Sequence, residues 1–419
     1  MFSDYHEDAD SRATLLTDSS KKLKAHFRLS NTTDTVANTI RRAILVHTPS
    51  VGFRTEPYDA STVEISVNTT PYPNEFLALR VGMVPVAADP LTFMPELFTF
   101  ELDVENRGKE VRKVYAKDLK IFMRDAANPL EAPLQVDTET LFPPDPITGD
   151  SLYLFDLQPQ WNPTAPYERV KMKAKAVVST GTENIRWSPV SQSSFEYTRD
   201  EDEAHVKDVF ASWLETQKKI GLEDQGKVDP TRMAELEAEF NTMEIQRCFK
   251  TNEVGEPNDF TFHVESIGVQ TVPDIVKSAL VACEVLVTKY QDMDGLVPDN
   301  VRVQQGDSRF TSIDFIFQNE SHTLGNLLAN WLVDNTINES AGSAITYAGY
   351  KVPHPSRPEM FVRVGIKDGL DEDMQKQTAR RAIAEACKAL KAQFRELAAA
   401  WDRITAPVAA GNVAAARNE

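Results

Sequence analysis

The chain has 419 residues and a formal net charge of −18 at pH 7, and its 41% hydrophobic residues suffice for a sizeable core. Such an acidic chain repels phosphate backbones, which argues against nucleic-acid binding as its main role. Its three cysteines, Cys248, Cys283 and Cys387, are too few and too dispersed for a disulfide framework or a cysteine-rich zinc site, and no apolar run of about 18 residues predicts a transmembrane helix.

The N-terminal segment is acidic and polar. Residues 1–20 lack the basic and then apolar pattern of a signal peptide, and they predict a disordered tail. Residues 23–29 alternate apolar and polar side chains, which is typical of a half-buried strand. Thr33 or Asp34 can cap a helix after this strand, and Pro49 ends it. One face of this helix is apolar at every fourth position, with Val36, Ile40 and Ile44.

The amino-acid composition changes twice in the middle of the chain. After a predicted strand at 62–67 and a short helix at 75–80, residues 88–197 are rich in proline and in short alternating segments, which indicates an inserted β-rich domain. Residues 198–257 then predict an acidic helical insertion, because 199–256 contains eight lysines and arginines against fifteen aspartates and glutamates. Two apolar helical stripes there indicate a hairpin, which is either a solvated decoration or an arm that docks a partner.

The C-terminal part returns to strands followed by helices. A strand at 260–264 precedes a helix that begins at Pro273. A new unit begins near residue 296, with a strand at 313–317, an amphipathic helix, and a second strand at 361–366. A long helix follows, and its apolar seam requires a partner helix. The seam residues are Ile383, Cys387, Leu390, Phe394, Leu397, Trp401 and Ile404.

An internal repeat relates the two ends of the chain. A shift of 288 positions superposes two segments that each contain a strand, a polar turn and an amphipathic helix. The matched pairs are Phe27 with Phe315, Asn31 with Asn319, Thr35 with Thr323, Val36 with Leu324, Asn38 with Asn326, Ile40 with Leu328 and Ile44 with Leu332. Two such units that pack face to face would form a pseudo-two-fold dimer within one chain.

Several segments resemble α-like subunits of multisubunit DNA-dependent RNA polymerases. Segments 27–31 and 36–45 resemble the first helix of these subunits, and segments 63–70, 74–85, 187–190 and 262–268 resemble the third subunit of RNA polymerase II. The second unit resembles the eleventh subunit through two more specific motifs, Asn319-Glu320-Ser321-His322-Thr323-Leu324-Gly325-Asn326-Leu327-Leu328 and Tyr347-Ala348-Gly349-Tyr350-Lys351-Val352-Pro353-His354-Pro355. Together these segments cover most of the chain in the expected order.

The resemblance implies an α+β fold in which two α-like dimerisation units form an intrachain pseudo-heterodimer. The first unit would be interrupted by a β-rich insertion domain and by the acidic helical segment. The implied division is a disordered tail at 1–20, a first dimerisation domain at 21–87 and 258–292, a β-rich insertion at 88–197, an acidic helical insertion at 198–257, a second dimerisation domain at 296–405 and a C-terminal tail at 406–419.

The resemblance also implies a function, which is that of a non-catalytic assembly platform in a DNA-directed RNA polymerase. Its partners would be the two large catalytic subunits and a small subunit equivalent to the tenth or twelfth of RNA polymerase II. No cofactor, membrane or sequence-specific DNA contact is expected, and the chain would be monomeric within the complex. The fused arrangement is typical of polymerases of large DNA viruses, which implies a virion, the host cytoplasm or the nucleus as its location.

Two sets of interface residues follow from the matched positions. The residues implied to face the large subunits are Asn38, Arg41, Arg42, Glu320, His322, Thr323, Gly325, Asn326, Pro353, His354 and Pro355. The residues implied to close the intrachain dimer are Val36, Ile40, Ile44, Leu280, Leu286, Leu324, Leu328, Trp331, Ile383, Leu390, Phe394 and Leu397. From the residues alone, Arg41 and Arg42 either bind carboxylates of a partner through bidentate contacts or are solvated surface side chains.

The chain departs from the third subunit in one respect that bears on metal binding. The inserted domain of that subunit often carries a zinc-binding cysteine cluster, whereas no cysteine here precedes Cys248. We therefore expect no zinc, and we expect turns and hydrophobic packing to stabilise the inserted domain. His322 is expected to form hydrogen bonds at a helix start rather than to bind a metal.

Two other classes of function compete with the role of a polymerase subunit. A nucleic-acid-binding transcription regulator that shares only the α-like fold would use the basic segments 109–113 and 171–175, which are small and lie in an acidic chain. An enzyme is disfavoured, because phosphate-binding, nucleophile-elbow and zinc-protease motifs are all absent. The acidic segment Asp292-Met293-Asp294-Gly295 predicts a turn between domains rather than a metal site.

Overall fold

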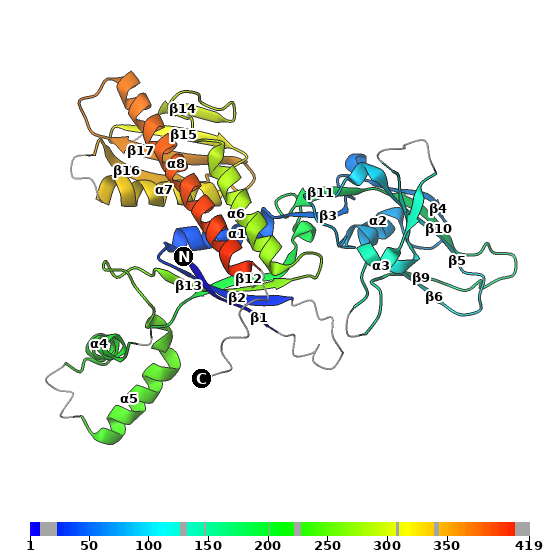
Figure 1. The fold of residues 1–419 in the computed structure, drawn as a ribbon, viewed down its shortest axis with the longest axis horizontal. Coiled ribbons are helices and arrows are strands. Elements are labelled where there is room, and N and C mark those ends of the chain that lie inside the picture. The colour runs from blue at the N-terminus through cyan, green and yellow to red at the C-terminus, as the bar shows by residue number, and fades with distance from the viewer. Residues whose placement is uncertain are drawn as a thin grey trace, which may run out of the picture.

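The computed structural model describes residues 1–8, 23–125, 132–145, 148–200, 202–221, 228–306, 310–338 and 343–406. Figure 1 shows three parts, namely a body with two sheets, a β-rich lobe beside it, and a pair of helices that projects below. We call these parts the double-sheet body, the β-rich lobe and the helical arm. Among the described residues, no helix is long and apolar enough to cross a membrane.

The first sheet of the double-sheet body joins strands from distant parts of the sequence. Its antiparallel strands are β1 (Phe2–Asp8), β2 (Lys24–Ser30), β13 (Asp259–Ser266) and β12 (Val190–Tyr197), in that spatial order. The alternation in β2 buries Ala25, Phe27 and Leu29, as expected for a half-buried strand.

Strand β1 corrects the expectation of a disordered tail over residues 1–20. Residues 2–8 pair with β2, and Phe2 is buried. The segment contains apolar side chains at Phe2 and Tyr5 that pack against the rest of the body, which stabilises a strand that is otherwise polar. Positions 9–22 lie outside the described residues.

The second sheet repeats the architecture of the first. Its strands are β14 (Val301–Gln305), β15 (Ser312–Gln318), β17 (Glu359–Ile366) and β16 (Ile345–Lys351), in that spatial order and all antiparallel. The register also corresponds, because Phe27 faces Phe262 in the first sheet and Phe315 faces Val362 in the second. The strand that corresponds to β1 is therefore β14.

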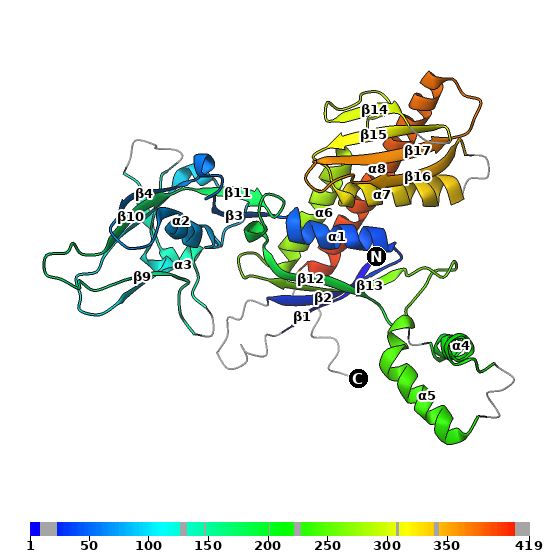
Figure 2. The same cartoon turned by 180° about the vertical axis from the view of Figure 1, so that it is seen from behind.

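Four helices complete the double-sheet body. They are α1 (Asp34–Val46), α6 (Val272–Thr288), α7 (His322–Leu332) and α8 (Glu372–Thr405). Side-chain caps start each of them: Thr33, Thr271, Ser321 and Asp371 accept hydrogen bonds from backbone N–H groups of the first turn. Figures 1 and 2 show α1 and α7 between the two sheets, with α6 and α8 side by side across both. One continuous hydrophobic cluster contains residues of both sheets and of all four helices.

The β-rich lobe has a hydrophobic core of its own. Its strands form sheets of order β4-β10-β5-β7-β8, β11-β3 and β6-β9. Its elements are β3 (Pro49–Phe53), β4 (Val63–Asn68), α2 (Asn74–Gly82), β5 (Phe98–Glu105), β6 (Arg112–Tyr115), β7 (Lys120–Met123), β8 (Leu134–Val136), α3 (Thr138–Leu141), β9 (Tyr153–Leu157), β10 (Arg169–Ala174) and β11 (Ala176–Thr180).

The limits of this lobe differ from the predicted insertion at 88–197. Strand β4 and helix α2 were predicted in the first dimerisation domain, but Val63 and Leu77 are buried in the core of the lobe. Strand β12 was predicted in the insertion, but it pairs with β13 in the first sheet. Alternation of apolar and polar side chains predicts that a segment is a strand, but it does not predict which sheet the strand joins. That choice depends on distant strands, and both boundaries were wrong for this reason.

The helical arm consists of α4 (Glu203–Trp213) and α5 (Pro230–Met243). A small cluster that includes Trp213, Leu236 and Phe240 holds these helices together. This agrees with the predicted hairpin of two apolar stripes. Shorter helical turns occur at Tyr58–Ala60, Pro95–Leu97, Ala116–Asp118, Ile185–Trp187, Leu214–Lys218, Ile245–Arg247 and Val333–Asn338.

Candidate functional site

The candidate site is the region where α1 and α7 approach each other at the centre of the double-sheet body. Arg42 Nε donates a hydrogen bond to Thr323 Oγ1 over 2.8 Å. The amide of Asn330 donates a second hydrogen bond to Thr35 Oγ1. Thr35 matches Thr323, and Arg42 matches Asn330, under the 288-residue shift of the repeat. The two contacts are therefore the same contact made twice in opposite directions, as in an isologous interface.

Arg41 has a different environment from Arg42. Its Nε and Nη2 donate to Asn38 Oδ1 on the preceding turn of α1, at 3.0 and 2.9 Å. Burial, together with the positive charge of Arg42, lowers the pKa of Arg41 from its ordinary value. Within the part of the chain that the structure describes, no carboxylate lies within ion-pair distance of Arg41 or Arg42. The two guanidinium groups thus form a partly buried positive pair that no carboxylate of the described residues neutralises.

Three predicted large-subunit contacts at the start of α7 are enclosed within the chain, namely Glu320, Thr323 and Gly325. The Glu320 side chain is only 9% exposed and accepts hydrogen bonds from Tyr290 Oη at 2.8 Å and Lys289 Nζ at 3.4 Å. Thr323 and Gly325 are buried. Because these groups are enclosed, they shape the start of α7 instead of presenting a contact surface.

Gly325 is explained by close packing inside the chain. A Cβ at this position would lie 2.4 Å from Cδ2 of Tyr350 and 3.1 Å from Sδ of Met360. Any side chain would therefore push the β16 tyrosine away from α7. The motifs around residues 319–326 and 347–355 thus meet in space at Gly325 and Tyr350.

The remaining predicted contact residues near α7 are at the surface. His322 is exposed, and its ring lies edge-on to Tyr350 with centroids 5.8 Å apart. Asn326 is half-buried, whereas Pro353, His354 and Pro355 are exposed in the turn after β16. Nδ1 of His354 accepts a hydrogen bond from the backbone N–H of Ser356 at 3.0 Å, which orders the turn. These residues are accessible to a partner.

The predicted dimer residues lie together in the core of the double-sheet body. Eleven of them are buried in the single hydrophobic cluster, and Trp331 is partly buried against it. Aromatic residues at the ends of α6 and α8 extend this packing across the repeat. Tyr290, just after α6, packs edge-on against Phe317 of β15 with centroids 5.0 Å apart. Each unit thus sends a helix onto the sheet of the other, because Trp401 of α8 also packs against β2.

Sequence reasoning missed several residues that connect the two units. Thr35, Asn330, Tyr290 and Phe2 were not identified as interface residues, yet each contacts the other unit. The 288-residue repeat could have identified Thr35 and Asn330, since they match Thr323 and Arg42. No comparable signal marked Phe2, which precedes the repeated segment.

No group of three or more histidine, cysteine, aspartate or glutamate side chains among the described residues is placed to hold a metal ion. Burial raises the pKa of the Cys283 and Cys387 thiols to about 12, which keeps both protonated. Asp294 in the acidic turn lies 3.4 Å from Lys388 Nζ. In the basic segment of β10, Lys173 forms an ion pair with Glu101 at 2.8 Å. The carboxylate partly neutralises the lysine, which is then less available to bind a nucleic acid.

Comparisons with known proteins show the family of the two units. Two family models, both described as the RNA polymerase Rpb3/Rpb11 dimerisation domain, match residues 26–288 and 312–400. The chain is 24% identical over 311 residues to the DNA-directed RNA polymerase II subunit RPB3 of Schizosaccharomyces pombe, covering 68% of this chain and 88% of that protein. It is 26% identical over 279 residues to the DNA-directed RNA polymerase subunit Rpo3 of Methanopyrus kandleri, covering 62% of this chain and 88% of that protein.

Proposed function

Because the chain belongs to the RNA polymerase family of Rpb3/Rpb11 dimerisation domains and carries two of them, we propose that it is a non-catalytic assembly platform of a DNA-directed RNA polymerase. In this role it docks the two large catalytic subunits and a small subunit equivalent to the tenth or twelfth of RNA polymerase II. The relatives, which are named as the DNA-directed RNA polymerase subunits RPB3 and Rpo3, support this role.

We further propose that the two units form a pseudo-heterodimer within one chain. The first unit comprises β1, β2, β12 and β13 with α1 and α6, and the second comprises residues 301–405. The common strand order of the two sheets and the reciprocal hydrogen bonds of Arg42 and Asn330 support this arrangement. The β-rich lobe and the helical arm are then insertions into the first unit.

Fusion of two subunits gives this arrangement a physical advantage. It fixes a one-to-one ratio and raises the effective concentration of one unit for the other. The isolated chain is then monomeric, because its dimer seam is occupied internally; a stable homodimer by light scattering would contradict this. A viral source, with a place in the virion, the host cytoplasm or the nucleus, is the corresponding proposal for its origin and location.

The observation that carries the docking proposal is the positive pair formed by Arg41 and Arg42. A partly buried guanidinium without a counter-charge is unfavourable unless a carboxylate approaches it. The chain has a net charge of −18, so two adjacent arginines without a neighbouring carboxylate among the described residues are unusual in it. A carboxylate supplied by a partner would explain them. The accessible turn at 353–355 and His322 offer a second contact area on the α7 side.

Affinity purification of the tagged chain from its native cells, with mass spectrometry, tests the platform role. We expect two very large subunits in the eluate together with RNA synthesis, whereas recovery of the chain alone would refute the role. Arg41→Glu should then reduce recovery of a large subunit about tenfold or more, since it converts an attraction into a repulsion. Arg107→Glu is a matched control, because the Arg107 side chain is 75% exposed on the β-rich lobe.

Arg41→Glu also distinguishes an effect on the interface from an effect on the stability of the fold. Among the described residues, the Arg41 side chain hydrogen-bonds to Asn38 on its own helix, so its replacement should leave thermal unfolding almost unchanged. Unchanged recovery of both large subunits would show that Arg41 is outside the interface. Arg42→Glu is less informative, because it also removes the hydrogen bond to Thr323.

A further inference from the structure

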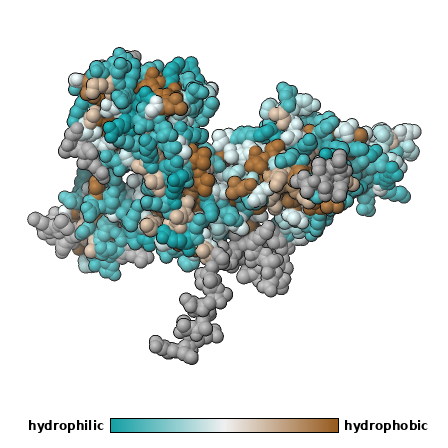
Figure 3. Space-filling model, turned by 45° about the horizontal axis from the view of Figure 1, so that its top comes forward, coloured by the Kyte–Doolittle hydropathy of each residue, from teal (hydrophilic) through white to brown (hydrophobic). Residues whose placement is uncertain are grey.

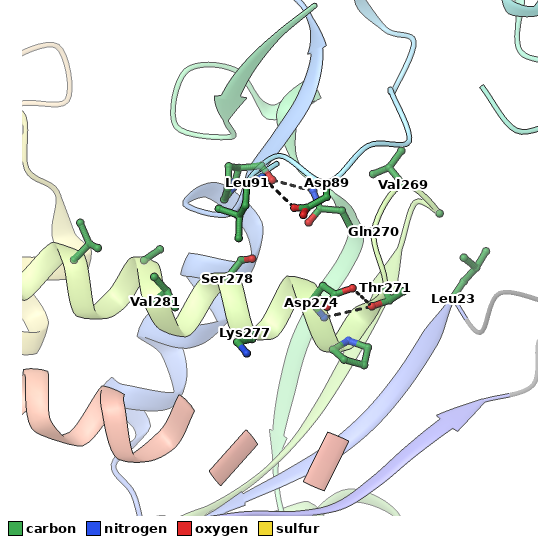
Figure 4. A pocket seen from close by; sticks show the side chains of 15 residues that line it. Leu23, Asp89, Leu91, Val269, Gln270, Thr271, Asp274, Lys277, Ser278 and Val281 are labelled. Carbon is green, nitrogen blue, oxygen red and sulfur yellow. Dashed lines mark hydrogen bonds between the residues drawn. The ribbon is translucent and has the colours of Figure 1, made fainter. Parts of the chain in front are cut away.

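A groove lies between the double-sheet body and the β-rich lobe. Its volume is about 950 Å³, and it is lined on one side by the outer face of α6 and on the other by the segment around Asp89 and Leu91. Figure 4 shows Ser278, Val281 and Lys277 along α6, with Leu91 and Asp89 facing them from the lobe. In Figure 3, hydrophobic surface is visible in the middle of the molecule, where these two parts meet.

The wall formed by α6 exposes two apolar side chains one helical turn apart. Val281 is 47% exposed and Val285 is 54% exposed, and Pro273 and Ser278 line the same side of the groove. Positions four apart lie one above the other on a helix, so Val281 and Val285 form a ridge with a shallow furrow beside it. The opposite face of α6 is buried in the core. Leu91, which is 78% exposed, adds an apolar contact from the lobe.

The charges at the rim of the groove are mainly negative. Asp89 and Asp274 lie on opposite sides of it. The one lysine of the lining, Lys277, is already paired, because its Nζ lies 2.9 Å from an oxygen of Asp402. Carboxylates at the edge of an apolar furrow favour a partner that is apolar in the middle and basic at its flank.

We propose that this groove docks an amphipathic helix of a partner protein, with its apolar face on Val281, Val285 and Leu91 and with lysine or arginine side chains toward Asp89 and Asp274. A helix is the occupant that fits, because a ridge on α6 packs into the furrow of a second helix at ordinary crossing angles. A helix in this position contacts both the lobe and the double-sheet body, so it sets the angle between them. The groove proposal rests on the proposed function in one respect, which is that the partner is another subunit of the polymerase.

Site-specific photo-crosslinking in the intact complex tests the proposal. A benzophenone amino acid replaces Val281 in the tagged full-length chain, and cross-linked peptides are sequenced after purification from the native cells. We expect a peptide from another subunit with apolar residues every three or four positions and an excess of lysine and arginine. A cross-link to residues 407–419 of the same chain, to a second copy, or to an acidic or non-helical segment would overturn the proposal, as would no cross-link.

Two sets of variants examine the chemistry of the contact. Val281→Glu with Val285→Glu should abolish the cross-link made from a benzophenone placed at Leu91, whereas Val254→Glu, at a residue 82% exposed on another surface, should not. Asp89→Asn with Asp274→Asn should weaken the contact by about twofold to fivefold per carboxylate and reduce its salt dependence. An undiminished cross-link in the valine variant would refute the apolar contact.

The same purification distinguishes this proposal from the proposed function. If the large subunits are recovered but position 281 gives no cross-link, the groove proposal fails and the platform role stands. If the large subunits are absent from the wild-type eluate, the platform role itself fails. The two valines point outward from α6, so their replacement should leave the melting temperature of the chain almost unchanged.

Discussion

Trp401 of α8 packs edge-on against Phe27 of β2, with ring centroids 4.8 Å apart. The two residues belong to different units of the repeat, and both are fully buried. Phe2 of β1 packs on the same indole at 5.1 Å, and the indole N–H donates to the carbonyl of Pro273 at 3.0 Å. Trp401 therefore connects the long helix of the second unit to both the sheet and the helix α6 of the first.

Trp401→Ala should destabilise the chain by about 3–5 kcal/mol, because it leaves a large cavity between the units. Urea unfolding followed by circular dichroism measures this free energy. Trp161→Ala is a matched control, since Trp161 is 87% exposed, and it should change stability by less than about 0.5 kcal/mol. Equal effects of the two substitutions would contradict the role of Trp401 at the junction.

The reciprocal hydrogen bonds predict a pattern of energetic coupling. A double-mutant cycle of Arg42→Ala and Thr323→Ala should give a coupling energy of about 1 kcal/mol, because the two side chains bond directly. The equivalent cycle of Asn330→Ala and Thr35→Ala should give a similar value. Arg42 and Thr35 are not bonded to each other, so their cycle should be additive. Coupling in that third cycle would show that the pairs do not act separately.

Gly325→Ala should destabilise the chain although alanine favours helices by about 1 kcal/mol over glycine. The new Cβ would lie 2.4 Å from the ring of Tyr350, and overpacking of this kind costs about 1–3 kcal/mol. In a Tyr350→Ala background the same substitution should be neutral or stabilising, because the ring is gone. Gly221→Ala is the control, because a Cβ added at Gly221 would have no neighbouring atom within 4 Å. Stabilisation by Gly325→Ala alone would mean that Tyr350 moves freely.

The ion pair of Arg28 with Asp259 predicts a loss of stability in acid. Burial acts to raise the pKa of Asp259, but hydrogen bonds from Arg28, Thr198 and Ser30 outweigh it and lower the pKa below its ordinary value of 3.8. The folded chain therefore binds fewer protons than the unfolded chain at acidic pH, so this contribution is present above about pH 4 and is lost as the pH falls through the folded pKa.

Asp259→Asn tests this pair. At pH 7 the variant should lose about 2–3 kcal/mol, since the guanidinium of Arg28 keeps both 2.6 Å contacts only with a carboxylate. The difference from wild type should shrink as the pH falls below about 4. Asp103→Asn is the control, because the same two-bond geometry with Arg169 is exposed and should contribute little. A difference that is constant with pH would argue against an ionised Asp259.

His47 predicts a second pH dependence, in a different range. Burial, aided by the positive charges of Arg42 and Lys289, lowers the pKa of His47 below its ordinary value of 6.5. The unfolded chain then binds more protons below pH 6.5, so stability decreases as the pH falls from 6.5 toward the folded pKa. His47→Gln should flatten this slope in unfolding measurements between pH 7.5 and 5.5. Lys289→Gln should flatten it partly, and an unchanged slope in both would exclude His47 as the source.

The sequence determined the elements and their repetition. Alternation at 23–29 and 313–317, and apolar stripes at Val36, Ile40 and Ile44 and their matches, identified two units of strand and helix. These patterns are local, because a half-buried strand or helix must place its apolar side chains with the period of its own backbone. The family was recognisable for the same reason, since its most specific motifs are contiguous in the chain.

Only the tertiary structure decided how these elements are joined. It placed β4 and α2 in the β-rich lobe, β12 in the first sheet, and residues 2–8 in a strand that the polar sequence did not predict. It also turned Arg42 toward Thr323, placed the Arg41 guanidinium on Asn38, and enclosed Gly325 against Tyr350. Periodicity fixes which face of an element is buried, but the partner of that face depends on contacts between residues hundreds of positions apart, which local patterns do not encode.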